Sequence, residues 1–171
     1  MTQWIDGIEY RWYRVPEYQG NGVGRVRNIA AFLWQVWRAV PSLAASNPDV
    51  VVASSTYPMD IWVARRIARK AKARLVFEVH DLWPLSPMEL FDMPRWHPFI
   101  MLCQRAEDTA YRDADVVVSM LPKVHEYMAS RGLDLRKLVL VPNGITLDEW
   151  HGEPEPLGPA LQSALQRARA D

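Results

Sequence analysis

The sequence predicts an α/β protein built on a doubly wound parallel sheet. Four short apolar runs, at residues 49–55, 75–79, 114–119 and 138–141, have the continuous aliphatic character of strands that are buried on both faces. Segments with helical spacing of apolar residues separate these runs, and such alternation of strands and helices is typical of a parallel sheet. A chain of 171 residues, of which 49% are hydrophobic, is long enough to bury one core.

The composition excludes several classes of protein. Lys plus Arg and Asp plus Glu number 20 each, so no overall field attracts nucleic acid, and electrostatic targeting must come from local patches. The single cysteine, Cys103, excludes an internal disulfide, and the start of the chain lacks the pattern of a signal peptide. No apolar stretch reaches the roughly 20 residues of a spanning helix. We therefore expect a cytoplasmic protein.

The first 45 residues predict a strand and a long helix. Side chains alternate over residues 8–15, after a turn at Asp6-Gly7, as expected of a strand. Residues 19–24 are rich in glycine but lack the G-x-G-x-x-G spacing of a phosphate loop. From Arg25 to about Ala45, apolar residues recur at helical spacing and form one stripe.

One edge of this helix has the composition of a helix that lies in a membrane interface. Arg27, Trp34 and Arg38 stand beside the apolar stripe. The next predicted helix carries a basic face that includes Arg65 and Arg69, and each basic residue near anionic lipid contributes up to about 1 kcal/mol. These residues are candidate contacts with the inner face of a membrane. The alternative is that both helices pack on the core and their basic residues are simply solvated.

The strongest candidate for chemistry lies where the second apolar run stops. Val79 is followed directly by His80 and Asp81, and the strand before it ends in Ser54 and Ser55. In open α/β sheets, ligands bind at the carboxyl ends of the strands, so these polar side chains are candidates for catalysis and binding. The alternative is that His80 bonds a loop carbonyl and Asp81 caps a turn.

The rest of the chain continues the same pattern. Residues 86–96, rich in Met and Pro, predict a loop that covers or grips a ligand, with Glu89 as a further candidate ligand. Pro122 suits the first turn of a helix, and Gly132 suits its left-handed cap. Asn143-Gly144 closes the last strand. Helices are predicted at residues 60–73, 98–112, 121–131 and 160–170, with a linker at 153–159.

Particular strings narrow the prediction further. In chain order they are Pro48-Asp-Val-Val-Val-Ala, Leu75-Val-Phe-Glu-Val-His-Asp-Leu-Trp-Pro, Ala114-Asp-Val-Val-Val-Ser and Leu140-Val-Pro-Asn-Gly-Ile. At these intervals they resemble the N-terminal half of a GT-B glycosyltransferase of family 4. Trp83-Pro-Leu-Ser-Pro-Met-Glu-Leu and His97-Pro-Phe are similar to the branch that builds bacterial surface polysaccharides, including fucosamine transferases. The resemblance covers about residues 8–150.

The resemblance implies a Rossmann-like domain at residues 1–150. Such a domain is the acceptor-binding half of a retaining enzyme that moves a sugar from a nucleotide sugar to a lipid-linked or saccharide acceptor, with no essential metal or cofactor. His80 matches the family histidine that lies against the transferred sugar, and Asn143-Gly144 matches the turn into the second domain. The candidate ligands for the sugar or acceptor are then Asp81, Ser54, Ser55 and Glu89.

Two parts of the family pattern have no counterpart in this sequence. The first strand, with its glycine-rich loop, should precede Ile8, and a second domain with paired glutamates should follow residues 151–171, which we interpret as a linker and short helix. Groups that stabilise the leaving nucleotide diphosphate belong mostly to that second domain. We therefore expect a truncated transferase that is inactive alone and needs the missing domain, in the same chain or as a partner.

Other functions remain open on the sequence. The main alternative is a non-catalytic binding or membrane-tethering module that pairs with a separate donor-binding chain. A stand-alone nucleotide-binding domain is less well supported, because no phosphate loop of the required spacing is present. The absent first strand also leaves two edges without partners: either residues 8–15 pair directly with residues 50–53, or the edges pair with another copy of the chain.

Overall fold

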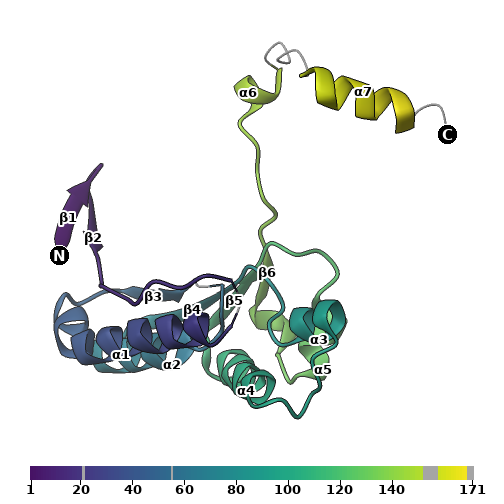
Figure 1. Ribbon diagram of the computed structural model, residues 1–171. Helices are drawn as coiled ribbons and strands as arrows, with labels where there is room; N and C mark the ends of the chain where they lie inside the picture. Colours follow the sequence, from purple (N-terminus) through teal and green to yellow (C-terminus); the bar gives the residue numbers. More distant parts are fainter. Residues whose placement is uncertain (21, 55, 152–157, 169–171) are drawn as a thin grey trace.

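The computed structural model describes residues 1–20, 22–54, 56–151 and 158–168, and its centre is a four-stranded parallel sheet (Figure 1). In spatial order the strands are β3 (Val50–Ala53), β4 (Arg74–Val79), β5 (Val116–Ser119) and β6 (Leu138–Leu140). The helices are α1 (Val23–Ala45), α2 (Asp60–Ala71), α3 (Leu85–Phe91), α4 (Pro98–Asp113), α5 (His125–Ser130), α6 (Leu147–His151) and α7 (Pro159–Ala168), with a short 3-10 helix at Leu135–Lys137. The predicted parallel α/β sheet is confirmed.

Strand β4 organises the core because it is hydrogen-bonded on both sides, to β3 and to β5. Its side chains alternate: Leu75, Phe77 and Val79 are buried, whereas Val76 and Glu78 on the other face are partly exposed. The buried set packs against residues of α2, α4 and α5, including Ile61, Ala64, Cys103, Ala106, Tyr111 and Met128. This alternation divides the sheet into a helix-covered face and an outer face.

The outer face of the sheet is unusual for parallel strands, which are ordinarily covered on both faces. Val50 and Val52 of β3 and Val139 of β6 are 50, 52 and 46% exposed. Figure 1 shows α1, α2 and α4 together on one side of the sheet, and α6 and α7 projecting away from it. The described part of the chain therefore leaves an apolar sheet face partly open to solvent.

The N-terminal strand is shorter than predicted and pairs elsewhere. β2 (Ile8–Arg11) pairs antiparallel with β1 (Thr2–Ile5), and the connecting Asp6 and Gly7 both have positive φ, as a tight hairpin turn requires. The expectation that residues 8–15 close against residues 50–53 is wrong, because a local hairpin provides the backbone partners instead. Pairing of the β3 edge with a second copy stays a prediction.

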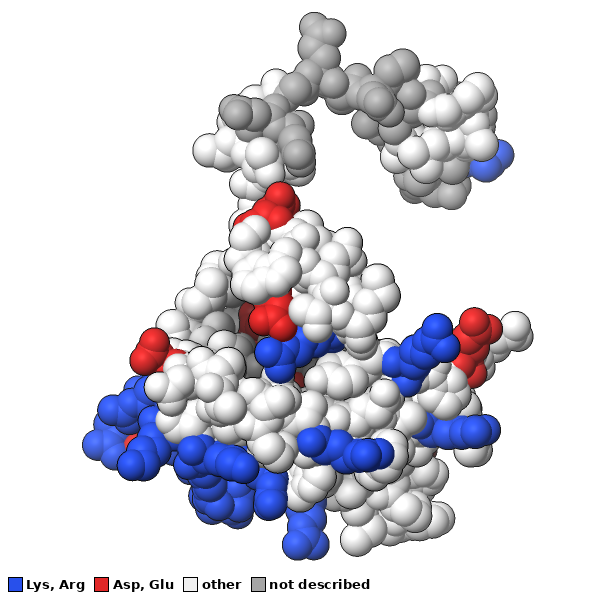
Figure 2. Space-filling model, turned by 90° about the vertical axis from the view of Figure 1, so that its left-hand side faces the viewer, with Lys and Arg blue, Asp and Glu red and all other residues white. Residues whose placement is uncertain are grey.

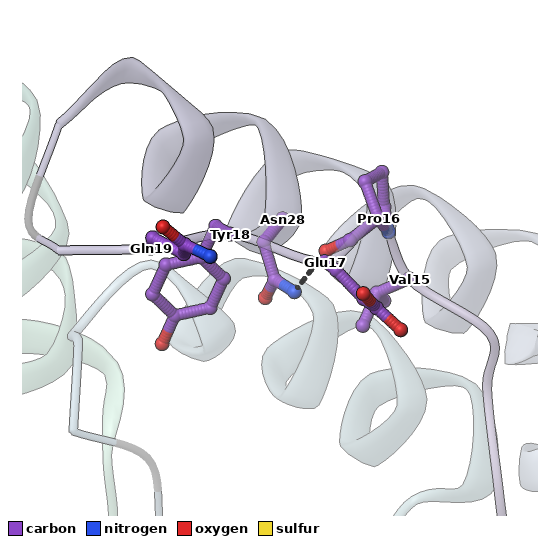
Figure 3. A pocket seen from close by; sticks show the side chains of 6 residues that line it. All are labelled: Val15, Pro16, Glu17, Tyr18, Gln19 and Asn28. Carbon is purple, nitrogen blue, oxygen red and sulfur yellow. Dashed lines mark hydrogen bonds between the residues drawn. The ribbon is translucent and has the colours of Figure 1, made fainter.

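Residues 12–20 form a strap that runs along α1. The side-chain amide of Asn28 donates to the carbonyl of Pro16 at 2.8 Å, and that of Gln35 donates to the carbonyl of Arg14 at 2.6 Å. Figure 3 shows Asn28 reaching toward this strap beside a hollow of about 610 Å³. A Cβ atom on Gly24 would lie 3.1 Å from the Cβ atom of Tyr18, so the strap approaches the helix closely. The glycine-rich segment thus serves a close packing contact.

Two predicted segments differ from the observed ones. The segment 86–96, predicted as a loop, is helical up to Phe91, because α3 runs from Leu85 to Phe91. Pro87 is tolerated there because it stands in the first turn of the helix, where a missing amide donor costs little. The helix predicted from Leu121 begins only at His125, since Lys123 has the left-handed φ of 58°. Gly132 does have the positive φ expected of a cap. Most of the predicted 153–159 linker lies outside the described residues.

A buried carboxylate links α4 to α5. Glu107 is 3% exposed, and its two oxygens accept hydrogen bonds from the hydroxyl of Tyr111 at 3.0 Å, the hydroxyl of Tyr127 at 2.9 Å and the amide of Gln104 at 2.8 Å. Burial raises the pKa of Glu107 above its ordinary value despite these donors. One turn away, the fully buried Cys103 lies 3.8 Å from the sulfur of Met59, and burial raises the pKa of its thiol to about 12.

Glu107→Gln should flatten the pH dependence of stability. A carboxyl group with a raised pKa binds a proton more readily in the folded than in the unfolded chain, so stability falls as pH rises from the ordinary pKa through the raised one. Urea unfolding between about pH 4 and about pH 8 measures this slope. Glu126→Gln, at an exposed position, is the control. An unchanged slope in Glu107→Gln would show that Glu107 does not titrate in this window.

Candidate functional site

The candidate site lies at the carboxyl ends of β3 and β4. The register pairs Ala53 with Phe77, so the residue that follows β3, Ser54, is level with Glu78. Side-chain alternation along β4 buries Val79 among the helices and directs Glu78 and His80 to the outer face. Local strand geometry therefore brings a hydroxyl, a carboxylate and an imidazole together.

These three side chains form what we call the Ser54–Glu78–His80 cluster. The Oγ atom of Ser54 lies 2.5 Å from Oε2 of Glu78 and 3.0 Å from Nε2 of His80. The distance from Nε2 of His80 to Oε2 of Glu78 is 3.6 Å. The side chains of His80 and Glu78 are 33 and 34% exposed, so a ligand can reach them.

The chemistry of the three groups fixes the direction of their hydrogen bonds. An ionised carboxylate only accepts, so the Ser54 hydroxyl donates to Glu78. The serine oxygen can then accept from Nε2–H of a neutral His80, which leaves Nδ1 without the proton. The serine proton faces glutamate rather than histidine, unlike the arrangement of a serine hydrolase. In this arrangement the serine hydroxyl bridges the carboxylate and the imidazole.

Asp81 has a structural role beside the cluster. Its Oδ1 atom accepts from the backbone amide of Leu82 at 2.8 Å and from the hydroxyl of Ser86 at 2.6 Å, which fixes the turn into α3. The alternative interpretation, in which Asp81 caps a turn, is thus correct for this oxygen. The side chain remains exposed and lines two cavities, so it can also face a ligand.

The other predicted ligands lie apart from the cluster or cannot be placed. Glu89 is exposed on α3, and none of the contacts found among the described residues joins it to His80. Ser55 lies outside the described residues. Asn143 and Gly144 are exposed in the segment between β6 and α6.

Sequence reasoning missed Glu78 as a member of the site. It is the only charged residue inside the apolar run from Leu75 to Val79, and it lies two residues before His80. In a strand, that spacing places both side chains on one face. The charge and the spacing together were the signal that could have identified Glu78.

An apolar cavity of about 550 Å³, which we call the α1–α3 pocket, opens next to Asp81. The guanidinium of Arg25 lies 5.2 Å from the ring centroid of Trp83, and the rings of Trp83 and Phe99 are nearly perpendicular, with centroids 5.9 Å apart. Apolar side chains dominate its walls: Val23, Val26, Ile29, Trp83, Pro87, Leu90, Phe91, Met93 and Phe99. Its size is that of an ordinary small-molecule site.

The candidate membrane residues divide into two groups. Trp34 is 59% exposed, with the guanidinium of Arg38 at 4.8 Å from its ring, and Arg27 is exposed on the same helix. Arg65 instead donates to Asp113 at 2.5 Å, and Arg69 lies 3.8 Å from the same carboxylate with its side chain 66% exposed. Figure 2 shows basic side chains gathered over the lower part of the displayed face.

Two further features bear on the class of protein. No group of three or more His, Cys, Asp or Glu within the described ranges could hold a metal ion. Among the helices that the structure describes, none is long and apolar enough to cross a membrane.

Ser54→Ala should change the tautomer of His80 with little loss of stability. Without the serine oxygen, Nε2–H loses its acceptor at 3.0 Å, and the neutral ring can carry its proton on either nitrogen. Nitrogen-15 NMR of the imidazole at alkaline pH distinguishes the two tautomers. Ser86→Ala, which removes the bond to Asp81, should leave the His80 spectrum unchanged. Identical His80 spectra for wild type and Ser54→Ala would rule out the proposed orientation.

Comparison with known proteins agrees with this architecture. Two solved structures are similar: Anabaena Alr3699/HepE in complex with UDP-glucose, at 17% identity and a TM-score of 0.50, and the same protein in complex with UDP and glucose, at 18% and 0.51. They cover 88 and 81% of this chain, which in turn spans 34% of each of theirs.

The family of the chain follows from its sequence. No protein with a curated function matches significantly. A family model described as a glycosyl transferase 4-like domain matches residues 2–144. The chain therefore belongs to the glycosyl transferase 4-like domain family.

Proposed function

We propose that this chain is the acceptor-side domain of a retaining glycosyltransferase. The reaction moves a sugar from a nucleotide sugar to a lipid-linked saccharide, a precursor of a surface polysaccharide, at the cytoplasmic face of a membrane. Asp81 and Ser54, beside His80, contact the sugar or the acceptor. Ser55 and Glu89 are the remaining candidate ligands, and the turn at Asn143-Gly144 leads toward the donor-binding domain.

The observation that carries this proposal is the Ser54–Glu78–His80 cluster at the carboxyl end of the sheet. Ligands of open α/β sheets bind at this edge. Nε2 of His80 lies 3.0 Å from the Ser54 hydroxyl oxygen, which can accept its proton when the ring is neutral, and the ring stays partly exposed. Nδ1 can then accept a hydrogen bond from a hydroxyl of the transferred sugar, which helps to position the sugar for reaction.

The groups that stabilise the charge of the leaving nucleotide diphosphate must come from another part of the enzyme. A departing nucleotide diphosphate needs cationic or amide groups aimed at its phosphates. Alr3699/HepE, whose crystal structures contain UDP-glucose or UDP and glucose, is about three times as long as the aligned segment. We infer that a donor-binding domain, in the same polypeptide or a partner, completes the site.

His80→Ala should lower kcat by about a hundredfold or more in the complete enzyme, because positioning contributions of this kind are large. The melting temperature should stay nearly unchanged, since the side chain is partly exposed. The measurement is sugar transfer by the chain together with its co-purified donor-binding polypeptide, with exposed His125→Ala as control. If the wild-type complex binds nucleotide sugar but transfers no sugar, the result would favour the non-catalytic binding module.

Membrane association is supported by one side of α1. An exposed tryptophan with an arginine stacked on its ring, as in Trp34 and Arg38, suits the boundary between lipid and water. A second pair of this kind, Trp37 with Arg66, stands where α1 meets α2, with the guanidinium 4.7 Å from the ring. Arg65, paired with Asp113, contributes less to such a surface than Arg69 does.

Binding to anionic vesicles should weaken as salt rises, because attraction between exposed charges decays over about 10 Å at 0.1 M ionic strength. Replacing Trp34 and Arg38 together by alanine should reduce it by about tenfold, and co-sedimentation measures both effects. The control replaces Trp4 and Arg11, which lie on the N-terminal hairpin. Equal loss in both double variants, or equal binding to neutral vesicles, would contradict a membrane surface on α1.

A further inference from the structure

The mouth of the α1–α3 pocket exposes large apolar side chains. Leu90 and Phe91, at the end of α3, are 73 and 69% exposed, and Val23 at the start of α1 is 85% exposed. Burying apolar side chains of this kind against an apolar partner stabilises a complex. An apolar group that fills the pocket and lies across its mouth therefore gains free energy from several residues at once.

Aromatic and cation–π contacts form the inner wall of the pocket. Trp83 is fixed between the guanidinium of Arg25, 5.2 Å from its centroid, and the ring of Phe99, 5.9 Å away at 81°. The two ends of this stack belong to α1 and α4, so the pocket is preformed by three elements. A preformed wall lowers the ordering cost of binding.

Few polar side chains face this cavity: Arg25, Asp81, His97 and Ser86, whose hydroxyl donates to Asp81. Arg25 supplies the positive charge. His97 accepts a bond from the amide of Phe99 through Nδ1 at 3.2 Å, so its neutral ring carries the proton on Nε2 and can donate. Asp81 supplies a carboxylate next to His80. An unattached saccharide would leave most of this wall without suitable partners, because it offers hydroxyls to apolar carbons.

We propose that the α1–α3 pocket binds the lipid chain of an amphipathic acceptor, with its phosphate at Arg25 and its first sugar directed along Asp81 toward His80. This inference rests on the proposed function and adds a site for the tail of the acceptor. Asp81 and Trp83 line this pocket and also the small cavity that His80 lines, so a ligand anchored in the pocket can direct its polar head toward the Ser54–Glu78–His80 cluster. The cation recognises the phosphate, and the apolar wall recognises the chain.

The test is calorimetric titration of the full chain with farnesyl phosphate, farnesol and inorganic pyrophosphate, at concentrations where neither lipid aggregates. Farnesyl phosphate should bind about tenfold more tightly than farnesol, because a charged hydrogen bond adds to the same apolar contact. Pyrophosphate should bind much more weakly than either. Pyrophosphate binding as tight as that of farnesyl phosphate would mean an anion site alone and would overturn the proposal.

Matched variants distinguish binding in the α1–α3 pocket from binding elsewhere on the surface. Leu90→Asp should weaken both prenyl ligands by about tenfold or more, whereas Leu161→Asp, an exposed leucine on α7, should not. Arg25→Gln should remove the preference for the phosphate, and exposed Arg27→Gln should retain it. Urea unfolding confirms that each variant is folded. Unchanged binding in folded Leu90→Asp would overturn the proposal, as would failure of the wild type to bind farnesyl phosphate.

Farnesyl phosphate binding is measured without a sugar donor, so its outcome is independent of the outcome of the sugar-transfer assay. Farnesyl phosphate binding that depends on Leu90, without any turnover in the complete enzyme, would support the pocket and refute the transferase. Turnover with a saccharide acceptor, without farnesyl phosphate binding, would refute the pocket and leave the transferase standing.

Discussion

The alternation of side chains along β4 is the constraint on which the rest of the structure depends. Hydrogen bonds to β3 and β5 fix the register, so Phe77 and Val79 must enter the helix-covered core while Glu78 and His80 face outward. A shift of one residue would bury the carboxylate and imidazole and expose the aromatic ring. The packing that stabilises the domain and the geometry of its candidate site are therefore specified together, by the register and alternation of this one strand.

Much of the sheet could be predicted from sequence because each strand carries its own signal. Continuous runs such as Val50–Ala53 and Val116–Ser119 are apolar on both faces, and their parallel pairing follows from the helices between them. The helix α3 was missed because Pro84 at its N-cap and Pro87 in its first turn resemble loop punctuation. Their tolerance at the start of a helix depends on positions that a sequence pattern does not fix.

The candidate site was predictable only in part, for a similar reason. His80 and Ser54 could be placed at the same edge from strand endings alone, but their contact depends on the pairing of Ala53 with Phe77. Register is a long-range property, so neither the contact of Ser54 with Glu78 and His80 nor the α1–α3 pocket could be assembled from local spacing. The wrong partner assigned to Ile8–Arg11 has a different origin, since a family sheet order took precedence over the local hairpin signal at Asp6-Gly7.

The burial of Cys103 has a practical consequence for following motions of this domain. A thiol that is fully buried, with a pKa raised to about 12, reacts negligibly with alkylating reagents while α4 stays packed on the sheet. Its labelling rate therefore reports how often α4 separates from its neighbours. Because Cys103 is the single cysteine of the chain, its labelling is a site-specific probe of local opening. The helix that it reports on also holds Glu107.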